Sequence, residues 1–367
     1  MRKASKGKPI AAAAPGARKA DPRLDQLLRE SEKKFGANAI RVGFPKGEDG
    51  KPKSFERLPT GSLTLDIALG GGLPLGRFTE LSGQYSIGKT TLAMHMVREA
   101  QAIGLTCAVV DAEGTIDEKY LESLGIDTKA LIYSPSEGLE EATQLMFDMQ
   151  KSGAVHFCVW DSIEASPPTR EYEKEMEDTM QLGVKPKINN LFFRKYMAGN
   201  NYLVRRGQKP FTLIGINQIR ERIGQLRGDP EFTVGGKGKD HASTIEMRLR
   251  KGDWIEEGKG QYKKIVGQIV KFKISKNKTF KRMQTGEFDF YLAENEQGVT
   301  PLYVDNVKEI IAEGVDHGLI EQKGSWFVVK ETGHKCHGVP DLVKHLRPQE
   351  ELIQRYRKHI IEQALKR

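Results

Sequence analysis

The strongest constraint on this chain is a glycine loop between two segments of different character. The loop runs Gly83-Gln84-Tyr85-Ser86-Ile87-Gly88-Lys89-Thr90 and satisfies in full the phosphate-binding pattern of Gly, four residues, then Gly-Lys-Thr. Arg77 to Leu81 before it has strand character, and Lys89 to about Ile103 after it has helical character. A glycine-rich surface turn could produce the same string by chance. The strand before and the helix after favour a nucleotide site.

Each part of this loop has a chemical task. We expect the glycines to let backbone N–H groups surround the β-phosphate, and Lys89 to lie between the β- and γ-phosphates. The Thr90 hydroxyl is a predicted Mg²⁺ ligand. The predicted ATP-binding residues are Gly83, Gln84, Tyr85, Ser86, Ile87, Gly88, Lys89, Thr90 and Thr91.

Carboxylates end two further apolar runs. Asp161 ends the run Phe157 to Ser162 and is predicted to hold the Mg²⁺ through its water shell. Asp111 and Glu113 end the run from Thr106. Hydrolysis needs a group that orients water, and Glu113 is the candidate because Asp111 is expected to make structural hydrogen bonds. The alternative for Glu113 is a carboxylate at a helix N-terminus.

The order of the apolar runs predicts the fold class. Buried parallel strands are expected at Thr106–Asp111, Val155–Asp161 and Phe211–Asn217. Alternating, antiparallel strands are expected at Thr244–Lys251, Gly267–Ile274 and Glu287–Leu292. A small domain is expected at the C-terminal end. It would consist of helices Val304–His317, Pro340–Leu346 and Gln349–Lys366 and a hairpin at Leu319–Val329. The prediction is an α/β P-loop ATPase core with a mixed, mainly parallel sheet, an N-terminal helix and a small C-terminal α+β domain.

Charge and cysteine content restrict the setting. The net charge is +9, and the first twenty residues hold six basic residues and no acid. Such a tail is expected to be disordered and to contact polyanions; a transit peptide is the alternative. No apolar run is long enough to span a membrane, and three cysteines suit a reducing compartment. We therefore expect a cytoplasmic protein divided into 1–20 (tail), 21–57 (oligomerisation segment), 58–296 (ATPase core) and 297–367 (small domain).

Several motifs in order resemble the RecA family of bacterial DNA recombinases. They are Leu58–Gly70, Gly72–Arg77, Asp111–Glu113, Ile216–Arg220, Gly235-Gly236 and Lys276-Asn277-Lys278. The resemblance runs from about Arg23 to the C-terminus, and its divergence suggests a phage-encoded member, which would work in the host cytoplasm. It implies a DNA-dependent ATPase in DNA repair, which forms helical filaments on single-stranded DNA and exchanges strands with homologous duplex. It also implies partners such as single-strand-binding and loader proteins.

The resemblance assigns further roles. Glu113 matches the catalytic glutamate, and Asp117 and Tyr120 match residues that hold and stack on adenine. Gln218 matches the glutamine that senses the γ-phosphate and couples it to the DNA loop that follows. Lys276 and Lys278 match the pair that reaches the γ-phosphate of the adjacent subunit's ATP; without the family they would be a solvated strand end.

Two loops are predicted to contact DNA. The second loop, between Arg220 and Lys237, is basic and glycine-rich, which suits a phosphate backbone; an ordinary surface loop is the alternative. Its predicted contacts are Arg220, Arg222, Ile223 as a wedge between bases, Arg227, Gly235, Gly236 and Lys237. The first loop falls between about Tyr172 and Lys187 and is crowded by acids. From this region Lys187 and Arg194 are predicted to touch phosphate.

The chain also departs from the family pattern. Gln84 and Tyr85 stand where the family usually has proline and glutamate, which puts signalling across the ATP interface in question. The segment Lys237–His241 is one residue shorter and lacks an aromatic that packs into the neighbouring subunit, so the polymer interface must differ. The chain ends without the family's acidic tail, and self-repression by such a tail is not expected. His334 to His337 has spacing that a zinc site could use, but its neighbours predict a loop.

Two other functions use the same core. One is a hexameric helicase or repair ATPase. The other is a DNA-bound scaffold that recruits partners, including self-cleaving repressors. The paired lysines and the N-terminal helix favour the recombinase.

Overall fold

The computed structural model describes residues 21–36, 39–44, 55–168, 184–221, 231–258, 260–293 and 302–366. The chain divides into two compact units, Met1–Lys53 and Ser54–Arg367. The first holds helix α1 (Pro22–Phe35), where Asp21 caps the N-terminus by accepting from the Arg23 backbone N–H. Pro22 occupies the first turn, where its missing N–H is not needed. This confirms the helix expected at the start of the chain.

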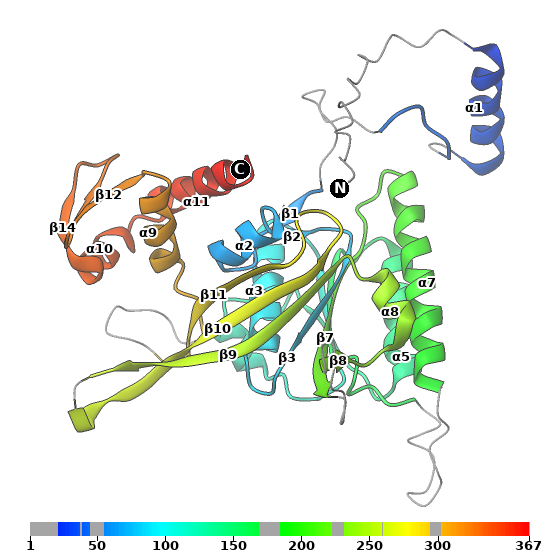
Figure 1. Ribbon diagram of the computed structural model, residues 1–367. Helices are drawn as coiled ribbons and strands as arrows, with labels where there is room; N and C mark the ends of the chain where they lie inside the picture. Colours follow the sequence, from blue (N-terminus) through cyan, green and yellow to red (C-terminus); the bar gives the residue numbers. More distant parts are fainter. Residues whose placement is uncertain are drawn as a thin grey trace, which may run out of the picture. The chain divides into compact units, whose positions relative to one another are not determined.

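The second unit is built on a mixed sheet (Figure 1). In its described part the sheet has nine strands, ordered β11-β10-β9-β3-β7-β6-β4-β5, with β8 paired to β7. The neighbours from β9 to β5 in this order run parallel, and β10 is antiparallel to both of its neighbours, β9 and β11. The strands are β3 (Phe78–Gly83), β4 (Cys107–Asp111), β5 (Ile132–Pro135), β6 (Phe157–Asp161), β7 (Thr212–Glu221), β8 (Glu231–Thr233), β9 (Ile245–Glu257), β10 (Lys264–Asn277) and β11 (Gln284–Tyr291).

Helices cover both faces of the sheet (Figure 1). Successive strand residues face opposite sides, so Val109 packs in the core beneath α3 while Val110 packs in the core beneath α5 and α7. The helices of this region are α2 (Leu63–Leu69), α3 (Lys89–Ala102), α4 (Glu118–Ser123), α5 (Leu139–Ser152), α7 (Val184–Arg205) and α8 (Gly236–Ala242). Two short strands, β1 (Arg57–Leu58) and β2 (Leu73–Pro74), pair beside them, and a 3₁₀ turn, Gly260–Tyr262, lies between β9 and β10.

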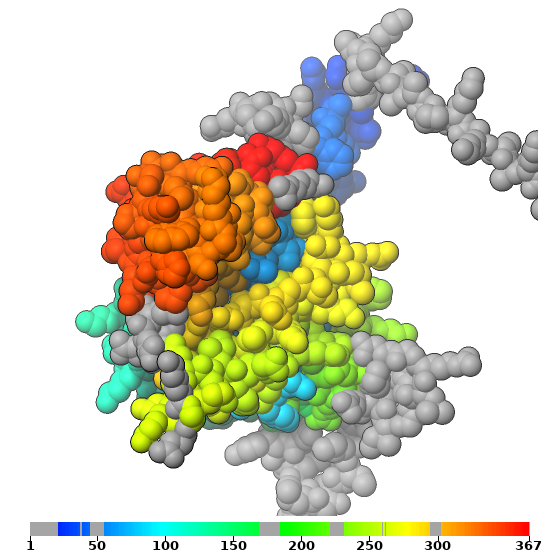
Figure 2. All heavy atoms as spheres, turned by 60° about the vertical axis from the view of Figure 1, so that its left-hand side comes forward, coloured from blue at the N-terminus to red at the C-terminus, as the bar shows by residue number. Residues whose placement is uncertain are grey.

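A small α+β domain follows the sheet, with its surface drawn in orange and red in Figure 2. It consists of α9 (Asn306–Asp316), β12 (Ile320–Lys323), β13 (Trp326–Val329), β14 (Lys335–His337), α10 (Gly338–Leu346) and α11 (Glu350–Ala364). Leu63 of α2 joins its apolar core. Arg357 of α11 forms an ion pair with the buried Asp66 of α2, and the Glu309 carboxylate accepts from the Ser62 hydroxyl at 2.7 Å. The domain is therefore joined to α2 by polar and apolar contacts.

The structure confirms the predicted α/β class and corrects three details. Strand β9 is antiparallel to β10, as expected, but pairs in parallel with β3. Its alternating pattern reflects exposure of one face along the β9–β10 hairpin and carries no information on direction. The segment after Gly235 forms helix α8, which the sequence did not suggest. Residues Lys335–His337 form β14 instead of a loop, paired with β13.

Two findings bear on the predicted setting. All three cysteines, Cys107, Cys158 and Cys336, are buried and free. Among the described residues, no helix is both long and apolar enough to cross a membrane.

Candidate nucleotide and nucleic-acid site

The glycine loop joins the end of β3 to the start of α3. Ser86 (φ 53°) and Gly88 (φ 85°) have left-handed backbone conformations, which turn the chain sharply into the helix. The Lys89 ammonium donates to the carbonyl oxygens of Gln84 at 2.8 Å and Gly83 at 3.3 Å, so the loop curls around its own lysine. Burial lowers the pKa of Lys89, and the nearby carboxylates of Asp161 and Glu113 oppose that shift.

Thr90 lies next to the carboxylate that ends β6. Its hydroxyl donates to Asp161 Oδ2 at 2.6 Å. Burial raises the pKa of Asp161 to about 6; the Thr90 hydrogen bond opposes this, and Glu113 adds to it. A hydroxyl and a carboxylate, both oxygen donors, form a set that suits the hard cation Mg²⁺. The residues present therefore fit the predicted metal.

Glu113 and Asp111 have different surroundings. Glu113 accepts a 2.7 Å hydrogen bond from the Ser162 hydroxyl. Asp111 accepts from the backbone N–H groups of Glu113 (3.1 Å), Gly114 (2.8 Å) and Ile116 (3.1 Å) and from the Tyr133 hydroxyl (3.0 Å). Asp111 is thus structural, as expected. Ser162 was not singled out from the sequence, although it directly follows Asp161.

Asp117 and Tyr120 belong to the N-terminal turn of α4, and Tyr120 contacts the first turn of α3. The Asp117 carboxylate caps α4 by accepting from the Tyr120 N–H at 3.1 Å. The Tyr120 hydroxyl donates to Thr91 Oγ1 at 2.7 Å, and burial raises its pKa. The Tyr120 contact ties α4 to the helix that carries Lys89, Thr90 and Thr91, and Asp117 lies at the N-terminus of α4.

Gln218 lies on β7 directly opposite Gly83 of β3. Its Oε1 accepts a 2.8 Å hydrogen bond from the Tyr85 hydroxyl. On the other side of β3, Gln84 Oε1 accepts from the Lys251 N–H of β9 at 3.3 Å. Gln84 and Tyr85, the two loop residues that depart from the family pattern, therefore attach the loop to β9 and β7.

Lys276 and Lys278 are not brought to the loop of their own chain. Lys276 donates to Ser243 Oγ at 2.9 Å and Glu246 Oε1 at 3.2 Å, and Lys278 donates to the His241 carbonyl oxygen at 2.8 Å. In the strand register Lys276 pairs with Glu246, and Glu246 pairs with Glu80. Glu80 precedes Gly83 by three residues, about 10 Å along a strand. The lysine pair thus faces the opposite end of β3.

The residues predicted to bind DNA are placed in part. Arg220, at the end of β7, forms an ion pair with Glu164. Gly235 (φ 119°) and Gly236 (φ 80°) turn the chain into α8, where Lys237 is exposed. Lys187 and Arg194 are exposed on α7. Arg222, Ile223 and Arg227 lie outside the described residues, as does most of the predicted first loop.

A buried ion pair anchors the chain just after the second predicted DNA loop. The Lys239 ammonium, fully buried on α8, donates to Glu80 Oε1 at 2.5 Å and Thr233 Oγ1 at 2.8 Å. Asn217, adjacent to Gln218, donates to the same Glu80 oxygen at 2.8 Å and to the Val234 carbonyl at 2.7 Å. The sequence suggested no such role for Lys239, because nothing local distinguishes a buried lysine from a solvated one.

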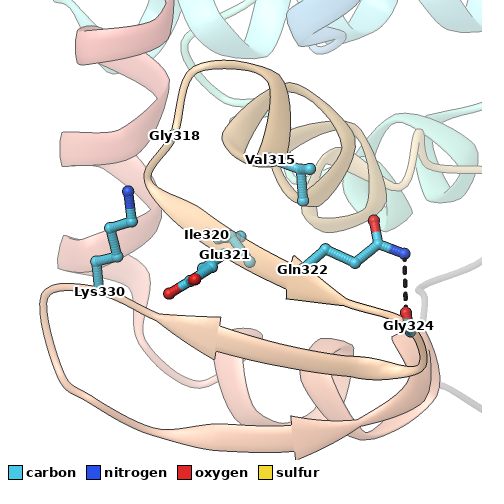
Figure 3. Close-up of a pocket in the computed structure, with 7 residues that line it drawn as sticks. All are labelled: Val315, Gly318, Ile320, Glu321, Gln322, Gly324 and Lys330. Carbon is cyan, nitrogen blue, oxygen red and sulfur yellow. Dashed lines mark hydrogen bonds between the residues drawn. The ribbon is translucent and has the colours of Figure 1, made fainter.

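A separate hollow lies on the small domain. It is lined by Val315, Gly318, Ile320, Glu321, Gln322, Gly324 and Lys330, and the Gln322 amide donates to the Gly324 carbonyl at one end of it at 3.2 Å (Figure 3). The Glu321 carboxylate pairs with Lys323 at 2.8 Å. None of the residues predicted to bind nucleotide or metal lines this hollow, so it is distinct from the strand-end site.

Comparisons with known proteins agree with the geometry. The family model described as the RecA N-terminal domain matches residues 22–297. "Protein RecA" of Thermotoga maritima is 34% identical over 305 residues, 83% of this chain and 80% of the relative. "Protein RecA" of an Arthrobacter species is 37% identical over 318 residues, 86% of this chain and 83% of the relative. "Protein RecA" of Chlorobaculum tepidum is 37% identical over 312 residues, 84% of each chain.

Proposed function

This chain belongs to the RecA family, and we propose that the residues around its glycine loop carry out the ATP hydrolysis that drives recombination. The protein is an ATP-dependent DNA recombinase and a DNA-dependent ATPase that uses ATP and Mg²⁺, binds DNA and forms filaments. The helicase alternative is not favoured. The observation that carries the residue assignment is the convergence of Lys89, the Thr90–Asp161 pair and the Glu113–Ser162 pair beyond the carboxyl ends of β3, β6 and β4.

Hydrolysis in this site divides among its side chains. Lys89 stabilises the charge that develops on the β- and γ-phosphates. Thr90 would ligate Mg²⁺ and Asp161 would hold it through its water shell, and the bound ion would supply charge that neutralises the phosphates. Glu113 orients the water that attacks the γ-phosphorus as the bond to ADP breaks, and accepts its proton. Ser162 fixes the Glu113 carboxylate by its 2.7 Å hydrogen bond.

Further residues are proposed to contact the adenine and the γ-phosphate of ATP. Asp117 and Tyr120 hold the adenine, a role supported by the contact of Tyr120 with Thr91 of α3 and by the place of Asp117 one turn before it on α4. Gln218 senses the γ-phosphate. Lys276 and Lys278 reach the γ-phosphate of the adjacent subunit's ATP, a role supported by their distance from their own loop. Activity then requires assembly, because each site is completed by a second subunit.

DNA contact is assigned to two segments. Phosphate oxygens are bound by six basic side chains: Arg220, Arg222, Arg227, Lys237, Lys187 and Arg194. Ile223 separates bases, and Gly235 and Gly236 close the second loop. Base pairing supplies sequence recognition, so contacts with the DNA backbone suffice.

The chain divides into four parts. Residues 1–20 are a basic tail, 21–57 an oligomerisation segment, 58–296 the ATPase core and 297–367 the small domain. Single-strand-binding and loader proteins are the expected partners, and the cytoplasm, of a host if the gene is phage-borne, is the expected location.

The direct test is strand exchange between circular single strands and linear duplex, measured with single-strand-dependent ATPase activity. Wild-type protein should form joint molecules with ATP. The Lys89→Ala variant should lose both activities, whereas Lys129→Ala, which changes an exposed lysine, should keep them. Turnover retained by Lys89→Ala would refute the site, and electron micrographs of closed rings on DNA would favour a helicase.

A further inference from the structure

The Tyr85 side chain forms a hydrogen bond with Gln218, the residue proposed to sense the γ-phosphate. It lies in the glycine loop, 71% exposed, and its hydroxyl donates to Gln218 Oε1 at 2.8 Å. The two residues are 133 positions apart in sequence, and the β3–β7 register, with Gly83 opposite Gln218, brings them together. The contact joins the loop to the residue assigned to γ-phosphate sensing.

The direction of this hydrogen bond matters for chemistry. A carboxamide has a carbonyl oxygen that only accepts and an NH₂ group that only donates. Phosphate oxygens are acceptors, so a glutamine that reads a phosphate must present its NH₂ group. Since the Tyr85 hydroxyl takes the carbonyl oxygen, the NH₂ group of Gln218 is left to point elsewhere. A phenol can donate or accept, but in this contact the Tyr85 hydroxyl donates to Oε1, so the carboxamide lies in the orientation whose NH₂ group can donate to phosphate.

The loop holds Tyr85 in place. Gln84 is fixed to β9 by the hydrogen bond from the Lys251 N–H, and its own carbonyl accepts from Lys89. Ser86 follows in the left-handed conformation. The residues on either side of Tyr85 thus constrain its backbone, and the phenol spans from the loop to β7.

From these contacts we propose that Tyr85 is a positioning residue that orients the Gln218 carboxamide for the γ-phosphate and so sets the coupling between ATP and DNA. The proposal rests on the sensing role assigned to Gln218 under the proposed function. A glutamate at position 85, as the family usually has, would accept a hydrogen bond and would attract the NH₂ group of Gln218 instead. In this chain residue 85 instead donates its hydrogen bond to the carbonyl oxygen of Gln218.

The test uses the full-length protein with single-stranded DNA and measures kcat and KM for ATP. Tyr85→Phe removes the hydroxyl and keeps the ring. A hydrogen bond of about 1 kcal/mol corresponds to about fivefold, so the DNA-stimulated kcat should fall about fivefold, with the loss carried by kcat and little by KM. Tyr262→Phe, which removes the hydroxyl of another exposed tyrosine, is the matched control and should behave as wild type.

A double-mutant cycle separates this proposal from the role of Gln218 itself. Gln218→Ala should abolish most of the DNA stimulation, and adding Tyr85→Phe to it should have less than a twofold further effect. A Tyr85→Phe variant with wild-type DNA-stimulated kcat would overturn the role of Tyr85 while leaving Gln218 in place. Equal effects of Tyr85→Phe with and without Gln218 would also overturn it. Full DNA stimulation in Gln218→Ala would instead refute the sensing role on which it rests.

Discussion

The Thr90 hydroxyl donates a 2.6 Å hydrogen bond to the Asp161 carboxylate, across 71 residues of sequence. The bond connects the first turn of α3 to the end of β6. The second such pair, Ser162 with Glu113, follows one residue later and connects β6 to the end of β4. The tip of β6 therefore contacts both the residues proposed to hold Mg²⁺ and the residue proposed to orient water.

Glu113→Gln should leave ATP bound and unhydrolysed. The amide cannot accept the proton of the attacking water, while its oxygen still accepts from Ser162. Turnover with single-stranded DNA should fall about 10²-fold or more, and filaments should persist after excess ATP is removed. Steady-state ATPase and filament lifetimes by electron microscopy check this, with Glu122→Gln, at an exposed glutamate of α4, as the control. Wild-type turnover in Glu113→Gln would contradict the assignment.

Lys276→Ala should lower turnover on the order of 10²-fold, because the variant cannot complete the neighbour's site. Mixed with Lys89→Ala subunits, which have a dead loop but an intact Lys276, it should regain ATPase activity. The matched control is the same mixture made with Lys89→Ala/Lys276→Ala subunits, which should give no rescue. Failure of the first mixture, with co-assembly demonstrated, would rule out the role in trans.

Glu309 should make stability depend on pH. Burial raises its pKa to about 7, against hydrogen bonds from Ser62 and Leu63 that oppose the shift. An acid whose folded pKa is raised stabilises the fold fully below its unfolded pKa, near 4.5, and loses that contribution as pH rises through 7. Between pH 5 and pH 8 the loss corresponds to about 2–3 kcal/mol.

Urea unfolding at the two pH values measures this. Glu309→Gln can turn its amide oxygen to the Leu63 N–H and its NH₂ group to the Ser62 hydroxyl oxygen, and it cannot ionise. Its free energy of unfolding should therefore vary less between pH 5 and pH 8 than that of the wild type. Glu350→Gln, at an exposed glutamate of α11, should retain the wild-type dependence. Identical pH profiles for Glu309→Gln and wild type would show that Glu309 is ionised in the fold.

The Lys239–Glu80 pair should be strongly coupled in stability. Lys239→Met leaves the buried Glu80 carboxylate without its cation, which costs about 3–5 kcal/mol. Glu80→Gln combined with Lys239→Met should recover most of that loss, since the amide oxygen still accepts from Asn217. Denaturant midpoints of the single and double variants test this, with Lys237→Met at the exposed neighbour as control. A single variant as stable as wild type would contradict the coupling.

How far the sequence predicts this protein depends on whether a feature is local. The glycine loop, the strands that end in Asp111 and Asp161, and the hairpin around Gly324 were all predicted, because turn chemistry and hydrophobic periodicity lie within a few consecutive residues. Motif order was enough to identify the family. The predicted antiparallel pairing of β9 was wrong on the side that faces β3, where the strands run parallel. An alternating pattern shows which face of a strand is exposed, but not which neighbour the strand pairs with.

The sequence by itself determined the nucleotide loop and the strands around it, since the glycine pattern of residues 83 to 90 and the hydrophobic periodicity beside it lie within short consecutive stretches. Only the tertiary structure decided the partners of Gln84, Tyr85 and Lys239. Tyr85 meets a glutamine 133 residues away and Lys239 a glutamate 159 residues away, and such contacts depend on strand order and register. The physical reason is that a side chain's hydrogen-bond partner is chosen by proximity in the folded sheet, which no short stretch of sequence encodes.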